Sequence, residues 1–446
     1  MTSALESYFQ VRQAGSTLRR EALAGVTTFL AMAYIVFVNP AILSQAGMDF
    51  GAVFTATCLS AAIATLIMAL FANYPIALAP GMGQNLFFLT LVTSGAATWQ
   101  QALGAVFIAG LVFLALTLTR VRSLLIEAIP GSLKTGLSVG IGLFITFIGM
   151  INAGLLTRQP DGAIRLGDLF TAPPMLAFAG FVVTAGLMAR RQPAALLWGI
   201  GASTTLALVS GLLRFEGVVG EPPSLAPTLL KMDLAGVLTL SMAPVVLVFL
   251  YVALFDAVGT LVAVGQRAGL VKDGKLIRGE RALAADAAGT MVGAALGTST
   301  VTAYVESAAG VEAGGRTGLA GLVTAGLFGL TLFAAPLVRM VGGGIQTPAG
   351  APLFPLTAPA LILVGALMTR GVLSGGSGIS WDDPTEALPA FLVMAGIPFS
   401  FSIADGLAIG FIAYPCLKVA AGRWREVGWP MYALSAMFVA RYFFLR

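Results

Sequence analysis

The stretch GTSTVTAYVESAAGVEAGGRTG, residues 297–318, decides the fold because long apolar runs flank it on both sides. It opens with hydroxyl-bearing and β-branched residues, and it then places Glu306 beside a run of small residues. Thr and Val favour extended chain, whereas small residues allow close helix packing. Non-helical backbone at membrane depth is tolerated only where protein buries it or where it lines a cavity. We therefore predict a short strand that leads into a half-helix opening at Glu306.

The whole chain has the composition of a polytopic membrane protein. Of its 446 residues, 58% are hydrophobic and only 10% are charged, and the mean hydropathy is +0.92. Soluble domains carry about 25% charged residues, so this chain could not cover a water-facing surface. The first apolar run begins near Ala22 and has full membrane length, which predicts a retained helix after an N-terminal segment, residues 1–21. The net charge of +5 is spread over loops and therefore indicates membrane topology rather than nucleic-acid binding.

The apolar runs predict about fourteen transmembrane helices, since a span needs about 20 mostly apolar residues and fewer where the helix is broken. Seven runs precede a polar stretch at 214–235 and seven follow it. They are 22–42, 52–72, 76–94, 101–119, 134–153, 173–189, 194–213, 240–264, 283–297, 300–313, 318–338, 356–371, 386–402 and 404–420. A further stretch, 427–444, is an extra span or an interfacial helix, and the sequence leaves both open. The predicted fold class is an all-α polytopic membrane protein.

The positive charges give the orientation. In a fourteen-span count, the loops richest in Lys and Arg all fall on one side of the membrane. These loops contain Arg12, Arg19, Arg20, Arg120, Arg122, Lys134, Arg190, Arg191, Arg267, Lys272, Lys275, Arg278, Arg281, Lys418, Arg423 and Arg425. The positive-inside rule makes that side the cytoplasm. We therefore expect a cell-membrane (inner-membrane) protein with a cytoplasmic N-terminus.

The two sets of seven runs predict an inverted repeat. Because seven is odd, the second set enters the membrane from the opposite side, which is the usual architecture of secondary transporters. The third run of each set is interrupted: residues 75–90 read PIALAPGMGQNLFFLT, and the counterpart is the opening stretch. Pro and paired Gly break a helix, as the Thr-rich segment does in the other half. Such matching breaks, in spans 3 and 10, predict short strands beside a central binding site.

Four carboxylates interrupt the apolar runs, although each costs about 2.5–3.5 kcal/mol at the bilayer centre. Asp256 and Glu306 are the candidates for a functional site. Asp286 also fits a structural role, tying a helix end to Arg281, and Asp405 fits an ordinary N-cap.

Two amides, Gln84 and Asn85, are the polar pair of the other broken segment. An amide offers both donors and acceptors, as the edge of a heterocyclic base requires. Satisfying the loose backbone at the helix break is the alternative role.

Several chemistries are excluded by what the sequence lacks. It contains no histidine, so a Ser/His/Asp triad, an HExxH zinc site and a histidine proton relay are impossible. Two cysteines in separate apolar runs make neither a disulfide framework nor a metal site. We predict no enzyme activity, no metal and no cofactor besides a coupled proton, which Asp256, Glu306 or Asp286 would carry.

Five segments resemble signatures of the adenine/guanine/hypoxanthine permeases, the azaguanine-type branch of the nucleobase/ascorbate transporter superfamily. They are REALAGVTTFLAMAYIVFVNPAIL (20–43), APGMGQNLFF (79–88), FDAVGTLVAVGQRAGL (255–270), ADAAGTMVGAALGTSTVTAYVESAAGVEAGGRTGL (285–319) and GFIAYPCLK (410–418). The resemblance spans nearly the whole chain. It implies a seven-plus-seven fold with a substrate-holding core, residues 22–119 and 240–338, and a gate, residues 134–213 and 356–420, with 427–444 as an extra terminal helix.

The resemblance also implies a site. In the family a Gly-Met-Gly-x-Asn motif, the aspartate of the eighth span and the glutamate of the tenth recognise purines, which matches Asn85, Asp256 and Glu306. Gln84 departs from the family pattern, in which an apolar residue more often precedes the motif's Asn. The further candidates for substrate contact are Ser307, beside Glu306, and the aromatic residues Phe87, Phe88 and Tyr304, for which plain packing is the alternative.

The expected function is import of a purine nucleobase (hypoxanthine, guanine or adenine) by proton symport, with the core moving against the gate. Uracil or xanthine transport on the same fold is an alternative. An anion transporter of the same fold is another, although two carboxylates at the site argue against it. The partners would be the purine and the lipid bilayer, with no nucleic acid, and homodimerisation stays open.

Overall fold

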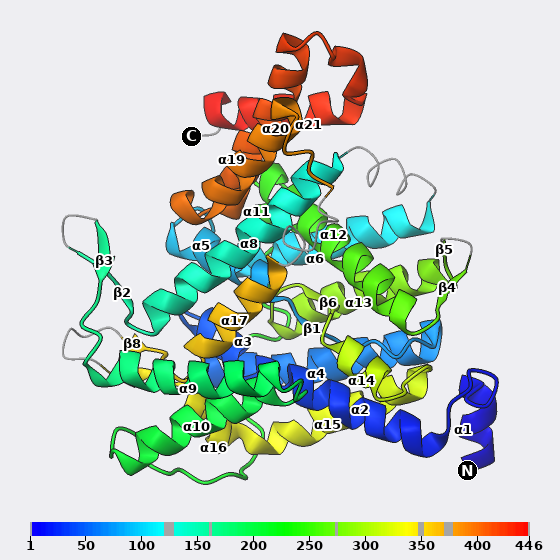
Figure 1. Cartoon of the computed structure of the whole chain (residues 1–446), viewed down its shortest axis with the longest axis vertical. Helices are drawn as coiled ribbons and strands as arrows, with labels where there is room; N and C mark the ends of the chain where they lie inside the picture. Colours follow the sequence, from blue (N-terminus) through cyan, green and yellow to red (C-terminus); the bar gives the residue numbers. More distant parts are fainter. Residues whose placement is uncertain are drawn as a thin grey trace.

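The computed structural model describes residues 2–119, 129–159, 163–272, 275–346, 352–369 and 378–444. Arg120 and Arg122, two of the charges used for the orientation, lie outside this part of the chain. Among the described residues, eight helical stretches are long and apolar enough to cross a membrane. In Figure 1, α2, α4, α9 and α15 run across the lower half of the molecule, and β1 and β6 lie near its centre.

The first half contains the predicted series of apolar elements. They are α2 (Leu18–Met32) with α3 (Ile35–Ser44), α4 (Phe50–Ile67) with the π-helix η1 (Met68–Ala72), β1 (Leu78–Pro80) with α5 (Met82–Thr93), α6 (Trp99–Leu118), α8 (Gly131–Asn152), α9 (Ala172–Ala189) and α10 (Ala195–Val209). The third element is a strand followed by a helix, as the Pro and Gly residues predict.

The second half repeats this order after the short α11 (Leu234–Val237). Its elements are α12 (Ala243–Arg267), α13 (Gly279–Leu296), β6 (Val301–Ala303) with α14 (Ser307–Glu312), α15 (Gly318–Thr331) with η2 (Leu332–Ala334) and α16 (Ala335–Gly342), α17 (Ala358–Met368), α19 (Pro384–Ser400) and α20 (Ile403–Ala420). The stretch at 427–444 contains α21 (Trp429–Phe444), which follows η3 (Trp424–Glu426).

The two interrupted spans pair with each other. β1 and β6 are antiparallel, with Leu78 opposite Ala303 and Pro80 opposite Val301. Backbone bonds continue the ladder at both ends, from Gly81 N to Thr300 O (2.9 Å) and from Tyr304 N to Ala77 O (3.0 Å). Antiparallel pairing is what two equivalent segments adopt around a two-fold axis in the membrane plane.

The helices pack in two groups. The first contains α2, α4, α6, α12, α13, α14 and α15, and the second contains α8, α9, α10, α17, α19 and α20. That these groups act as a substrate-holding core and a gate, and that they move against each other, stays a prediction.

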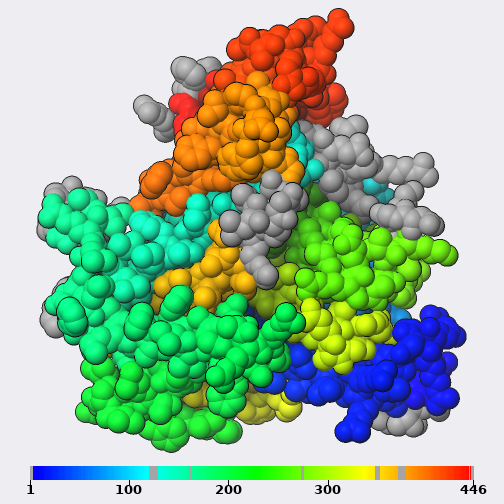
Figure 2. Space-filling view, in the orientation of Figure 1, coloured from blue at the N-terminus to red at the C-terminus, as the bar shows by residue number. Residues whose placement is uncertain are grey.

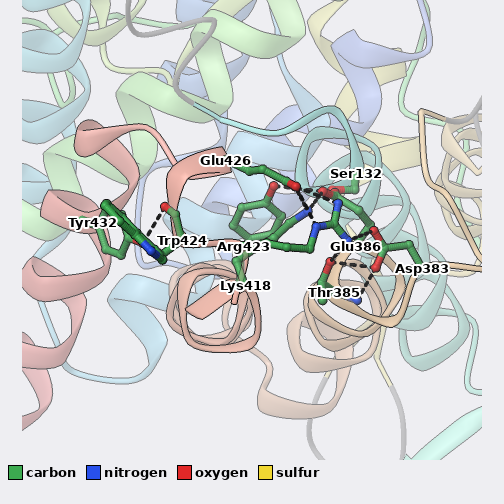
Figure 3. A network of polar contacts seen from close by, with 10 residues as sticks. Ser132, Asp383, Thr385, Glu386, Lys418, Arg423, Trp424, Glu426 and Tyr432 are labelled. Atoms are coloured by element: carbon green, nitrogen blue, oxygen red, sulfur yellow. Dashed lines mark hydrogen bonds and ion pairs between the residues drawn. The ribbon is translucent and has the colours of Figure 1, made fainter. Parts of the chain in front are cut away.

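A polar cluster ties the second group together (Figure 3). The Lys418 ammonium of α20 lies 2.8 Å from Glu386 of α19 and 2.9 Å from Glu426 of η3. The Ser132 hydroxyl of α8 donates to the same Glu386 carboxylate at 2.5 Å. Lys418 is 1% exposed, so the two carboxylates compensate a buried charge.

The hydropathy pattern did not indicate α1 (Thr2–Phe9) or three short hairpins. The hairpins are β2 (Leu156–Arg158) with β3 (Ile164–Leu166), β4 (Val271–Lys272) with β5 (Lys275–Leu276), and β7 (Ile345–Gln346) with β8 (Pro352–Leu353). They lie in polar segments, where apolar periodicity carries no signal.

Candidate substrate site

Hydroxyl groups from neighbouring helices hold the two central strands. Thr65 of α4 accepts a hydrogen bond from Leu78 N (2.9 Å) and donates one to Leu78 O (3.1 Å). Thr290 of α13 donates to Val301 O at 2.8 Å. Because unpaired backbone groups are costly away from water, these bonds stabilise a strand pair that has no further strand on either side.

Glu306 lies at the N-cap position of α14, directly after β6. The Tyr34 hydroxyl donates to its Oε1 atom at 2.8 Å. Tyr34 lies at the break between α2 and α3, so a bend in span 1 places a donor beside span 10. The Glu306 side chain stays partly accessible although Tyr304 and Ser307 on either side are buried. Glu306 is therefore less enclosed than the polar residues that support the strand pair.

Asp256 lies in α12, which packs against β6 and α14. Its Oδ2 atom accepts a hydrogen bond from the Gln84 amide at 3.3 Å, and its side chain is also partly accessible. Asp256 thus lies on a helix that packs directly against the helix that Glu306 precedes. The structure therefore brings together the carboxylates of spans 8 and 10 and an amide of span 3.

Asp286 is fully buried and ties α13 to the central strand. Its Oδ1 atom accepts hydrogen bonds from Ala303 N (2.8 Å) and from the Thr302 hydroxyl (3.3 Å), whereas Oδ2 has no hydrogen-bond partner. Arg281 lies instead 5.7 Å from the Phe71 ring centroid. Asp286 therefore supports the strand that precedes Glu306 and does not tie the helix end to Arg281.

Asn85 is part of a buried amide and hydroxyl network. Its Nδ2 group donates to Asn39 Oδ1 at 2.6 Å, and its Oδ1 atom accepts from the Ser299 hydroxyl. Asn39 in turn donates to Thr57 (2.6 Å) and to Thr298 (2.9 Å). Both amide groups of Asn85 are thus occupied by protein, so in this structure Asn85 positions α5 against the segment before β6.

The remaining candidates are also engaged by protein groups. The Ser307 hydroxyl accepts from Ala77 N at 3.0 Å, and the Tyr304 hydroxyl donates to Pro80 O at 2.5 Å. Phe87 packs on Phe249 with ring centroids 4.6 Å apart. Phe88 is fully buried. Their contacts in this structure are those of packing and strand support.

Sequence reasoning missed Tyr34, Asn39, Thr57, Thr298 and Ser299. Each is a polar side chain within an apolar run, which is a usable signal in a membrane protein because such groups need partners there. Their partners lie up to 272 residues away, as in the Tyr34–Glu306 pair, and only the fold shows them. Among the described residues, no group of three His, Cys, Asp or Glu side chains could hold a metal ion.

Comparison with known proteins identifies the family of this chain. A model of a permease family matches residues 19–409. The chain belongs to this permease family. A guanine/hypoxanthine permease of Bacillus subtilis is 43% identical over 99% of this chain and 100% of its own length. An adenine permease of Escherichia coli is 42% identical over 99% of this chain and 96% of its own length. The resemblance to the adenine/guanine/hypoxanthine permeases is thereby confirmed.

The fold of this permease is also found in a solved structure. The transmembrane domain of a cyanobacterial bicarbonate transporter aligns with a TM-score of 0.65, covering 87% of this chain and 97% of that domain. At 17% identity this likeness shows the fold alone. The predicted fold class is confirmed: this permease is a mostly helical, multi-pass membrane protein with a seven-plus-seven inverted repeat and short strands in spans 3 and 10.

Proposed function

We propose that this permease is a secondary active transporter that imports purine nucleobases together with protons. The observation that carries the proposal is the accessible pair of carboxylates, Asp256 and Glu306, beside the strand pair at the centre of the fold. Guanine and hypoxanthine present ring N–H groups, and guanine and adenine present an exocyclic amino group. A carboxylate can accept a hydrogen bond from each of these donors. The relatives named for guanine, hypoxanthine and adenine support this substrate class.

Each carboxylate has a protein donor that orients it. Tyr34 donates to one oxygen of Glu306, and Gln84 donates to one oxygen of Asp256. This arrangement leaves the second oxygen of each group for the substrate. Gln84, where the family more often has an apolar residue, contributes to the site through Asp256.

Asp256, Glu306 and Asp286 are the proposed proton carriers, since the chain has no histidine. In symport, one of these carboxyls would hold the proton while the base is bound at the site, and it would release the proton on the cytoplasmic side when the base leaves, so that the two cross together. The coupled proton would be the only ion required, and the cytoplasmic side would be the face that carries the Lys- and Arg-rich loops.

Alternating access would arise from movement of the core group, residues 22–119 and 240–338, against the gate group, residues 134–213 and 356–420. The close approach of Gly83 to Ile141 supports a moving boundary next to the motif that contains Gln84 and Asn85, because a Cβ atom at Gly83 would lie 2.6 Å from Ile141 Cγ2. A movement there would expose the site to alternate sides.

The test is uptake of radiolabelled hypoxanthine, guanine and adenine in cells that lack endogenous purine permeases. We expect saturable uptake that an uncoupler abolishes, with large losses in Asp256→Asn and Glu306→Gln. Glu312→Gln is the matched control, because Glu312 ends the same helix and is exposed, pairing with Arg267 at 3.0 Å. Full activity of both site variants would refute the site, and uptake insensitive to the uncoupler would refute proton coupling.

Anion transport is the second candidate, since the solved relative in fold is a bicarbonate transporter. Two carboxylates at the centre would repel a carboxylate or bicarbonate substrate. Competition of labelled hypoxanthine by unlabelled purines, uracil, xanthine and bicarbonate at two pH values separates the three substrate classes.

A further inference from the structure

A second cleft lies away from the central site, on the face that carries the N-terminal segment. It has a volume of about 170 Å³. Five segments far apart in the sequence line it: the end of α1 with the turn that follows, the residue after η1, the turn after α12, the start of α13 and the start of α15. In Figure 1, α1, α14 and the β4–β5 hairpin lie at the same edge of the molecule, and Figure 2 shows the N-terminal residues forming its lower right corner.

The N-terminal segment is fixed over this cleft by specific contacts. Phe9 and Val11 are buried against Leu319 of α15. The Asn73 amide donates to Phe9 O at 2.9 Å, and its carbonyl accepts from Gly318 N at 2.7 Å. The Ser16 hydroxyl donates to Gly314 O at 3.2 Å. The cleft is therefore a built feature whose walls are tied to one another.

Two guanidinium groups line the cleft, and neither pairs with a carboxylate among the described residues. The Nε atom of Arg278 is buried without any hydrogen-bond partner. Arg316 donates through Nη1 to Val311 O (2.6 Å) and Gly315 O (2.7 Å), which leaves other N–H groups of its fork unused. The buried Arg278 Nε donor, which lacks an acceptor among the described residues, indicates a missing partner, since native proteins leave few such groups.

The acid near Arg316 is already occupied. The Glu21 carboxylate accepts from the backbone N–H groups of Arg316 (2.9 Å) and Thr317 (3.3 Å), and it is fully buried. The other polar lining residues are Gln10, Gln13, Asn73 and Thr317, which are neutral and can donate. The cleft thus offers positive charge and donors from several sides.

We infer that this cleft binds a phosphate group, carried either by a lipid headgroup or by a small soluble phosphate compound. The planar N–H donors of an arginine guanidinium match the oxygens of a phosphate group. Two such guanidinium groups, those of Arg278 and Arg316, line this cleft. An occupant would contact the N-terminal segment, α13 and α15 at once. It would therefore fasten the N-terminus to the group of helices that contains Asp256 and Glu306, at a site separate from the proposed purine site.

The test is thermal unfolding of the purified full-length protein in detergent, with inorganic phosphate titrated against chloride at constant ionic strength. We expect phosphate to raise the Tm of the wild type. In Arg278→Gln the apparent Kd for phosphate should weaken by roughly tenfold or more, as expected for loss of a charged hydrogen bond. Arg281→Gln is the matched control, because Arg281 lies in the first turn of the same helix and outside the cleft.

A second variant keeps both arginines in place. Ala14→Glu adds a carboxylate at an exposed position on the rim, so it should abolish the phosphate effect without disturbing the fold. Nanodiscs of phosphatidylglycerol compared with phosphatidylcholine distinguish the source. If the occupant is a lipid headgroup, phosphatidylglycerol nanodiscs should raise the Tm of the wild type but not of Ala14→Glu. If it is a soluble compound, inorganic phosphate should raise the Tm and phosphatidylglycerol should not. No effect in either arm, or an equal effect in Arg278→Gln, Ala14→Glu and Arg281→Gln, would overturn the inference.

Discussion

Gly83 of the broken third span has no room for a side chain. A Cβ atom there would lie 2.6 Å from the Cγ2 atom of Ile141 in α8, well inside van der Waals contact. The neighbouring Gly81 is equally restricted, because a Cβ atom would collide with the Gln84 side chain that donates to Asp256. The two glycines therefore allow the close approach of strand, half-helix and gate at the proposed site.

Gly83→Ala should reduce purine uptake, because overpacking costs about 1–3 kcal/mol and here separates α5 from α8. Ile141→Ala in the same chain should restore part of the uptake by removing the atoms that clash. Gly186→Ala is the control, since nothing lies within 4 Å of a Cβ atom at Gly186. Loss of uptake that Ile141→Ala does not relieve would contradict the steric explanation.

At the scale of elements, the connection from α19 to η3 depends on Arg423. Its guanidinium donates to Asp383 Oδ2 (2.6 Å) and, through two nitrogens, to both oxygens of Glu426 (2.7 Å each), as Figure 3 shows. The hydrogen bond from Arg423 lowers the pKa of Asp383 to about 2. The same guanidinium lowers the pKa of Glu426 to about 2.

A carboxyl whose pKa is depressed by folding stabilises the folded state above its unfolded pKa, about 3.9 for Asp. That contribution is lost as the pH falls from about 4 through about 2. The difference in Tm between the wild type and Asp383→Asn should therefore be constant above pH 4 and shrink below it. Asp382→Asn, at the exposed neighbouring position, should show no such change. A difference in Tm between the wild type and Asp383→Asn that persists unchanged to pH 2 would count against the pairing. The expected difference in Tm is small, because the ion pair is solvent-accessible.

The elements also show what a sequence can reveal. Pro75, Pro80 and the Thr-rich stretch before Glu306 predicted both broken spans, because local chain chemistry decides where a helix stops. The helix α13 begins at Gly279, earlier than the predicted 283, because its first turn is polar and hydropathy does not detect it. α1 was not predicted, because the burial of Phe9 depends on a cluster that includes the distant Leu319.

The site was predicted only in part for the same reason. Asp256 and Glu306 stand out in an apolar chain because a carboxylate within the bilayer has a large free-energy cost. Tyr34 as the donor to Glu306, and Asn39 and Ser299 as the partners of Asn85, depend on contacts between distant spans. The sequence therefore predicts which groups are unusual, whereas the fold shows which of them are already occupied.

At the scale of the whole molecule, β4–β5 lies apart from the other two hairpins, since β8 lies on the same side of Figure 1 as β2 and β3. β2–β3 and β4–β5 lie on opposite sides of Figure 1. Leu166 of β3 and Lys272 of β4 are exposed. If the Lys- and Arg-rich face is cytoplasmic, the β2–β3 hairpin lies outside the cell.

Cysteine labelling tests this orientation. In a Cys416→Ser background, which removes the exposed native thiol, Leu166→Cys should react with a membrane-impermeant maleimide on intact cells. Lys272→Cys should react only after permeabilisation. The opposite pattern would reverse the assigned topology.

The central claim is that the accessible carboxylates of spans 8 and 10 hold the purine. Binding of radiolabelled hypoxanthine to the purified protein tests it most directly, because binding requires neither a proton gradient nor movement of the gate. We expect Glu306→Gln to weaken binding, with a Kd roughly tenfold or more higher, since a charged hydrogen bond is lost, whereas Glu312→Gln on the same helix should bind as the wild type does. Equal affinity of Glu306→Gln and the wild type would contradict it.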